Sequence, residues 1–151
     1  MTVYFISDNH GKTCIATALS KQTIRFDALL LECASTDEVT TPLSARDIDI
    51  NLTDMFRSKP DDTDELVVRD LTSTVMTFAF DDSIKAYDSI ERHNEQYEAI
   101  VKIIRSVGIT KTVGIIVGEA HLKDNEGDDI NWKSHATKLQ KAMKSVQVIV
   151  L

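Results

Sequence analysis

The sequence has little cysteine, with Cys14 and Cys33 as the only two among 151 residues. They form no C-x-x-C pair, which argues against both a structural zinc site and a redox motif. Both fall in segments with the character of a core helix and a core strand. Buried free thiols in a reducing compartment are the usual form of such cysteines. We therefore expect an apolar core that is large enough to stabilise the fold without disulfides.

Features of membrane and nucleic-acid-binding proteins are also missing. No apolar run approaches the roughly 18 residues of a membrane span, and residues 1–8 lack the basic region of a signal peptide. Acidic residues outnumber basic ones 24 to 17, for a net charge of -7, and no lysine and arginine cluster offsets the repulsion of phosphates. We expect a cytoplasmic protein, exported only by a non-classical route if it is an effector, with no nucleic-acid or membrane partner.

Short apolar runs typical of buried strands recur at residues 3–6, 27–33, 112–117 and 146–150. Runs that are apolar throughout indicate strands covered on both faces, as in parallel sheets. Helical spacing predicts helices at 13–19, at 82–107 with Asp82 or Ser83 as the N-cap, and at 132–143. The pattern predicts one α/β domain over residues 1–151, a three-layer fold with a mostly parallel sheet and helices on both faces.

Residues 34–64 interrupt this pattern. Threonine, aspartate and serine dominate there, and both prolines, Pro42 and Pro60, lie in this segment. We expect a long loop or partly ordered insertion with one helical turn near Leu52–Arg57, because loops of this length usually cover a site or are disordered. Residues 66–80 fit either a helix that becomes extended or two strands.

Polar side chains follow three predicted strands. The first strand ends at residues 8–10, with Asp8 and His10, the second at Glu32, and a later one at Glu119 and His121. Open α/β sheets bind ligands just beyond the carboxyl ends of their strands. Two imidazoles and several carboxylates could there hold a divalent metal or share acid and base duties. The alternative is that each residue only caps a turn, although the equivalent positions of His10 and His121 favour a site.

These strand ends also resemble those of a known superfamily. The later end, Gly118-Glu119-Ala120-His121-Leu122, matches a G-x-x-H motif, and residues 7–10 match a second copy with Ser7 in place of glycine. Glu32 matches an acidic residue that closes the second strand, and Glu91-Arg92, with Asn94 just after, matches an E-R motif at a helix start. On these motifs the chain, from residue 3 to 151, resembles the TraB/TIKI superfamily, which includes ChaN-like proteins and erythromycin esterases.

The resemblance implies a hydrolase of a peptide or ester bond in a peptide or small-molecule substrate. TIKI-like members are metal-dependent proteases and erythromycin esterases hydrolyse a lactone, whereas ChaN-like members bind haem, so the fold serves binding as well. A divalent metal such as Mn, Co or Zn is the implied cofactor. The candidate metal ligands are His10, His121 and Asp8, and the candidate catalytic residues are Glu32, Arg92 and Glu119. Without a metal, one histidine would be the base and Arg92 would stabilise the oxyanion.

Three alternatives stay open. Arg92 lies nearly opposite the apolar stripe of its helix, so it reaches the strand ends only if the helix begins near it or bends; otherwise it is a solvated charge.

The chain could also be a non-catalytic effector with a protein partner. Residues 6–11 resemble the opening D-x-H of calcineurin-like metallophosphoesterases, but the second strand is followed by Glu32-Cys33-Ala34 and G-N-H is absent from the sequence, so this interpretation ranks lower.

The remaining features have simpler interpretations. His93 lies at the edge of an apolar stripe, which predicts a packed or half-exposed side chain, and His135 lies near lysines, which predicts a solvated one. The acidic run at 124–129 lacks the spacing of a calcium-binding loop, so we expect a solvated loop. Leu30 and Ile116 are predicted to be central-strand core.

Overall fold

The structure is a computed structural model that describes residues 1–9, 13–34, 37–57, 63–81, 89–108, 110–127 and 131–151. Its main sheet contains five strands, β1 (Thr2–Asp8), β2 (Ala28–Leu31), β3 (Met76–Ala79), β4 (Thr112–Gly118) and β7 (Gln147–Val150). The strand order is β3-β2-β4-β1-β7 and every ladder between these strands is parallel. The predicted α/β fold with a parallel sheet is therefore confirmed.

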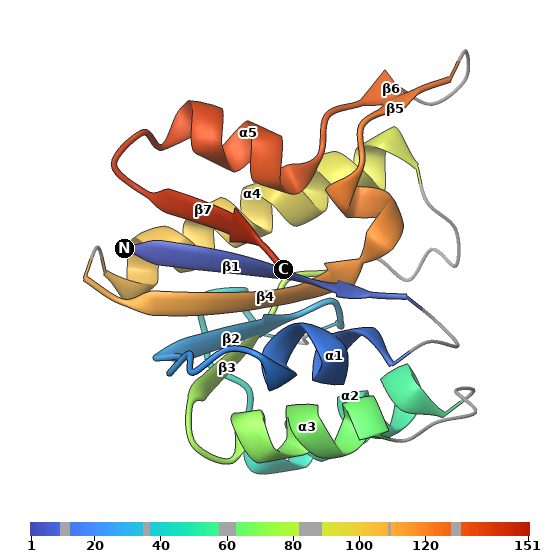
Figure 1. The fold of residues 1–151 in the computed structure, drawn as a ribbon, viewed down its shortest axis with the longest axis vertical. Helices are drawn as coiled ribbons and strands as arrows, with labels where there is room; N and C mark the ends of the chain where they lie inside the picture. The colour runs from blue at the N-terminus through green and yellow to red at the C-terminus, as the bar shows by residue number, and fades with distance from the viewer. Residues whose placement is uncertain (10–12, 35–36, 58–62, 82–88, 109, 128–130) are drawn as a thin grey trace.

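Helices cover both faces of this sheet. The helices are α1 (Cys14–Ser20), α2 (Ala45–Phe56), α3 (Thr63–Thr72), α4 (Ile90–Val107) and α5 (His135–Ala142). From β1 through β2 to β3 the chain moves toward one sheet edge, and from β3 through β4 to β7 it moves back. Because parallel crossovers are right-handed, this reversal puts the second set of helices on the opposite face. Figure 1 shows α1, α2 and α3 on one side of the sheet and α4 and α5 on the other.

Each face of the sheet has its own apolar core. Leu30 packs in the core under α4 and α5, and Ile116 packs in the core under α1, α2 and α3. Both side chains are fully buried, which confirms the prediction that they are central-strand core. None of the helices in the described ranges is long and apolar enough to span a membrane.

Several local predictions were wrong. The expected loop at 34–64 contains the three-turn helix α2, whose N-cap is Ser44, and α3 begins at Thr63. Helix α4 begins at Ile90 with Ser89 as its N-cap, while the predicted caps Asp82 and Ser83 lie outside the described residues. The predicted last helix is shorter, because Trp132 lies in β6 (Asn131–Trp132), which pairs antiparallel with β5 (Asn125–Glu126).

Candidate functional site at the carboxyl end of the sheet

The carboxyl ends of the parallel strands bring polar side chains from four segments to one edge. Asp8 ends β1, Glu32 follows β2 directly, and Asp81 follows β3 after one residue. Strand β4 ends at Gly118, which is the register partner of Asp8, and continues into the 3-10 helix η1 (Glu119–Leu122). The parallel register therefore accounts for the convergence that the strand-end residues predict.

Glu32 is held by donors from two neighbouring elements. The backbone N–H of Gly118 donates to Glu32 Oε2 at 2.5 Å, and Gln96 Nε2 donates to Glu32 Oε1 at 3.2 Å. A Cβ atom at position 118 would lie 3.2 Å from Oε2, so glycine lets the carboxylate approach the backbone closely. Burial raises the pKa of the Glu32 carboxyl above its ordinary value, and the Gly118 N–H, His121 and Arg92 oppose that rise.

Arg92 reaches this carboxylate from the first turn of α4. Ser89 caps the helix by accepting a hydrogen bond from the Arg92 N–H, so the helix begins near Arg92, as the sequence requires for an arginine at the strand ends. Its Nη2 atom lies 3.2 Å from Glu32 Oε1 and 2.6 Å from Asp81 Oδ2. The side chain is 16% exposed. Arg92 is therefore a bridge between two carboxylates and not a solvated charge.

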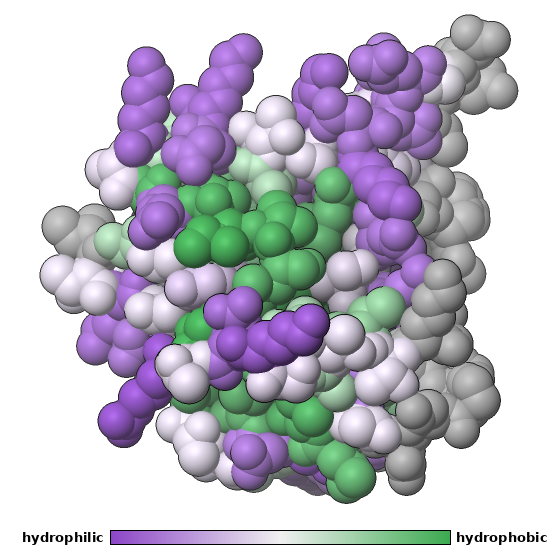
Figure 2. All heavy atoms as spheres, in the orientation of Figure 1, coloured by the Kyte–Doolittle hydropathy of each residue, from purple (hydrophilic) through white to green (hydrophobic). Residues whose placement is uncertain are grey.

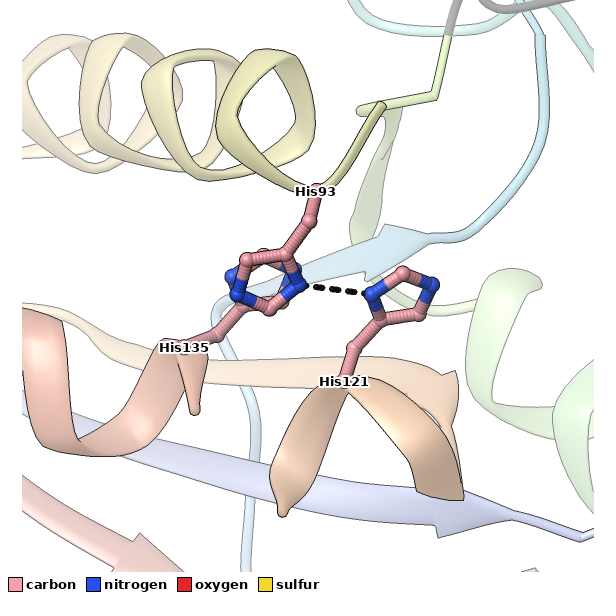
Figure 3. A group of neighbouring side chains, drawn as sticks. All are labelled: His93, His121 and His135. Atoms are coloured by element: carbon pink, nitrogen blue, oxygen red, sulfur yellow. Dashed lines mark hydrogen bonds between the residues drawn. The ribbon is translucent and has the colours of Figure 1, made fainter. Parts of the chain in front are cut away.

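Three histidines lie beside this carboxylate group, one from each of three elements. His93 is on α4, His121 on η1 and His135 at the start of α5, and all three are at most 1% exposed. One ring nitrogen from each lies within 4.8 Å of those of the other two. Figure 3 shows the rings of His93 and His121 edge to edge, with His135 behind His93. These three buried histidines could hold a metal ion.

The hydrogen bonds of the histidines determine where their protons lie. The Lys133 carbonyl oxygen can only accept, so His93 Nε2 donates to it at 2.7 Å. A neutral His93 then has a lone pair at Nδ1, and His121 Nδ1 donates the 2.7 Å bond that joins the two rings. On its other side, His121 Nε2 lies 3.7 Å from Glu32 Oε1. Polar contacts thus extend from Glu32 through two imidazoles to the backbone, and the 3.7 Å contact between Glu32 and His121 is longer than a hydrogen bond.

His135, the third histidine of the group, differs from the other two in its hydrogen bonds. Gln96 uses its amide nitrogen on Glu32, so its Oε1 accepts from His135 Nε2 at 3.0 Å. Burial and the neighbouring imidazoles of His93 and His121 lower the pKa of His135 to about 2, so the ring is neutral and its Nδ1 carries a bare lone pair. Within the described part of the chain, this buried Nδ1 has no hydrogen-bond partner.

Aromatic rings pack the histidines tightly. The His93 ring stacks on His135 with a centroid distance of 4.0 Å, and Trp132 stacks on the other side at 4.5 Å. Trp132 is held by a hydrogen bond from its indole N–H to the Lys123 carbonyl oxygen. The prediction of a solvated His135 was wrong, and of the two alternatives for His93 the packed one is confirmed.

The other predicted site residues are placed less centrally. Asp8 is 5% exposed at the end of β1. The Glu119 side chain is 39% exposed, accepts a hydrogen bond from Asn9 and lies 2.7 Å from Lys123 Nζ, so it is turned toward solvent. His10, the partner predicted for His121, lies outside the described residues. Neither Asp8 nor Glu119 joins the histidine group in the part of the chain described.

Sequence reasoning assigned no site role to His93, His135, Gln96 or Asp81. A usable signal lies in α4, whose buried residues include His93, Gln96, Ile100 and Ile103. Two polar residues at core spacing in an amphipathic helix indicate a buried polar contact. Nothing comparable marks His135, because the residues around it on α5 are mixed in polarity.

A hollow on the surface lies away from the site residues described above. Its volume is about 440 Å³, and it is lined by residues of α5 and β7, namely Ala136, Thr137, Gln140, Lys141, Val148 and Val150. Figure 2 shows apolar side chains gathered over these two elements. The hollow contains none of the predicted site residues.

Comparison of the chain with protein-family models, curated proteins and solved structures finds no match.

Proposed function

We propose that this chain is a hydrolase of peptide or ester bonds, acting at the carboxyl end of its parallel sheet around Glu32 and Arg92. The observation that carries the proposal is the Glu32 carboxylate, held at a strand end by Arg92, Gln96 and the Gly118 N–H. Ligand sites of open α/β folds lie at this edge. A buried carboxylate that only ended a strand would be costly, and its set of donors indicates a role that keeps it there.

The two side chains have complementary roles in this proposal. Glu32 accepts a proton from the attacking water and returns it to the leaving group, as carboxyl groups do in general acid–base catalysis. Arg92 stabilises the negative charge that develops on the substrate oxygen. Asp81 lies 2.6 Å from Arg92 Nη2 and orients the guanidinium, and His121 Nε2 lies 3.7 Å from the same Glu32 oxygen that Arg92 contacts.

The resemblance to the TraB/TIKI superfamily supports the same reaction class and remains part of the proposal. It implies a peptide or small-molecule substrate and a divalent metal such as Mn, Co or Zn. Among the described residues, His121 is the imidazole that the resemblance assigns to that metal. A metal there would supply a Lewis acid and an activated water.

Hydrolysis of a p-nitrophenyl ester and of fluorescently labelled casein tests the proposal, each with chelator and with added Mn²⁺, Co²⁺ or Zn²⁺. We expect Glu32→Gln to reduce kcat at least about 100-fold, the lower range for loss of an acid–base group. Arg92→Lys should lower kcat as well, because a lysine cannot span both carboxylates.

Asp27→Asn is the matched control. Asp27 also accepts a backbone hydrogen bond, from Thr112 N at 2.9 Å, but at the amino end of the strands, so its loss should leave hydrolysis unchanged. No turnover by the native chain in either assay, or full activity in a folded Glu32→Gln variant, would overturn the proposal and favour the non-catalytic effector.

A further inference from the structure

We propose that His93, His121 and His135 together bind one transition-metal ion, with Zn²⁺ as the ion that best suits three imidazole ligands. This ligand set shares only His121 with the set that the resemblance implies, and replaces His10 and Asp8 by His93 and His135. The inference does not rest on the proposed hydrolase activity, because metal binding is measured without turnover.

The first support is that three imidazoles converge at one buried place. The three imidazoles come from α4, η1 and α5, are almost fully buried, and each offers a nitrogen within 4.8 Å of the others. The chain has four histidines in total, so three of them meet in one place. Apolar side chains would fill this volume without the cost of burying polar atoms.

The second support is the set of oxygen atoms behind the rings. Metal-bound histidines almost always donate the N–H of their other ring nitrogen to a carbonyl or carboxylate, which fixes the tautomer that ligates. Lys133 O receives the Nε2 proton of His93, and Gln96 Oε1 receives that of His135. Glu32 Oε1 lies 3.7 Å from His121 Nε2. All three Nε2 atoms therefore face oxygens, which leaves the three Nδ1 atoms for the metal.

The third support is the lone pair of His135. Its Nδ1 is buried and has no hydrogen-bond partner among the described residues. Its Nε2 donates to Gln96 Oε1 at 3.0 Å, which leaves the lone pair of the ring on Nδ1. A buried acceptor without a partner is rare in folded proteins and needs an explanation, and a bound ion is one that fits a histidine nitrogen.

Metal binding requires a small rearrangement that can be observed. The Nδ1 atoms of His93 and His121 are 2.7 Å apart, closer than the roughly 3.3 Å between ligands that follows from tetrahedral Zn–N bonds of about 2.0–2.1 Å. The ion takes the place of the proton between them, and that proton moves from His121 Nδ1 to its Nε2, which faces Glu32 Oε1, so the ring stays neutral. The stacked rings must also turn apart. Trp132, the only tryptophan of the chain, stacks on His93 and reports this movement.

The experiment uses the full chain, stripped of metal with a chelator and titrated with Zn²⁺ and with Co²⁺. We expect saturation at one ion per chain in tryptophan fluorescence and in calorimetry. The Co²⁺ form should show the intense visible absorption of a tetrahedral site. Zinc X-ray absorption spectroscopy on the native chain should show imidazole nitrogens from three histidines, and needs no variant.

Two single variants separate the ligand sets. His135→Gln keeps a group that can bond Gln96 but removes the Nδ1 ligand, and should weaken Zn²⁺ at least about 100-fold, since loss of even a supporting partner costs 10–100-fold. His10→Ala should bind like the native chain. Loss of binding in His10→Ala with retention in His135→Gln, or fewer than three imidazoles in the absorption spectrum, would overturn the proposal. So would the absence of saturable binding by the native chain.

Discussion

Arg92 is the cation on which the carboxylates at the strand ends depend. It lies between Glu32 and Asp81, so one positive charge faces two negative ones in a partly buried setting. Removing it would leave two carboxylates close together without the guanidinium charge that offsets their repulsion. The same two charges also act on the neighbouring thiol of Cys33.

We expect Arg92→Ala to destabilise the fold by roughly 3–5 kcal/mol, the cost of breaking a buried ion pair on one side. Urea unfolding measures this. Arg69→Ala is the control, because Arg69 also contacts two carboxylates, Asp49 and Glu65, but with a side chain 34% exposed. Its loss should cost below about 1 kcal/mol. Equal costs for the two variants would contradict the burial argument.

The thiol of Cys33 should be unreactive in the folded chain. Burial, together with the charges of Asp81 and Glu32, raises its pKa to about 12, so only about one thiol in ten thousand is ionised at pH 8. An unfolded cysteine, with a pKa near 8.5, is ionised to about a quarter. Alkylation of Cys33 by iodoacetamide should be about a thousandfold slower in buffer than in urea, as followed by peptide mass spectrometry. Fast alkylation of the native chain would show that the thiol is not held as described.

How far the site is predictable differs from residue to residue. Glu32 and His121 could be assigned to one sheet edge because the direction of a parallel strand determines where its end lies. The direction of the Arg92 side chain could not, because it depends on which residue begins α4. His93 and His135 meet only through the packing of α4 against the segment before α5, a contact that no local pattern encodes.

At the scale of elements, the start of α4 determines the geometry of the site. Asp82, Ser83 and Ser89 are all good N-cap residues, so composition does not rank them. Ser89 is the one that accepts the Arg92 N–H, at 3.1 Å, and this places Arg92 in the first turn above the ends of β2 and β3. Had the helix begun at 82 or 83, Arg92 would lie mid-helix on its exposed face.

We expect Ser89→Ala to cost about 1 kcal/mol, the usual loss for an N-cap, and also to lower hydrolysis, because Arg92 loses its fixed starting point. Ser44→Ala removes the equivalent cap of α2, where Ser44 Oγ accepts from Asp47 N. It should cost a similar free energy without affecting hydrolysis. Thermal unfolding and the ester assay test both variants. If the two substitutions changed hydrolysis equally, Ser89 would have no role in positioning the site.

At the scale of the whole molecule, most of the fold follows from the order of apolar runs. Strands that are apolar throughout require cover on both faces, and the right-handed crossover rule then assigns the helices to faces. Helix α2 was not predictable in this way, because three of its residues are aspartate and its buried residues are Leu52 and Phe56 alone.

Leu30→Ala and Ile116→Ala test the two cores separately. Leu30 belongs to the core on one face and Ile116 to that on the other, and each substitution should cost about 2–5 kcal/mol. Val150→Ala is the control, since Val150 is 54% exposed and its loss should stay within about 0.5 kcal/mol. Unchanged urea midpoints for Leu30→Ala and Ile116→Ala would contradict the double-sided sheet.

The position of β1 has a consequence for synthesis of the chain. Thr2 pairs with Thr112 on one side and with Gln147 on the other, so β1 is synthesised before both of the strands with which it pairs. Until then its apolar residues, among them Val3, Phe5 and Ile6, have no sheet to join. Such non-local pairing slows folding and leaves apolar strands exposed to aggregation. The nascent chain is therefore a candidate client for chaperones that bind apolar segments during translation, and the sheet can be completed only after β7 has been synthesised.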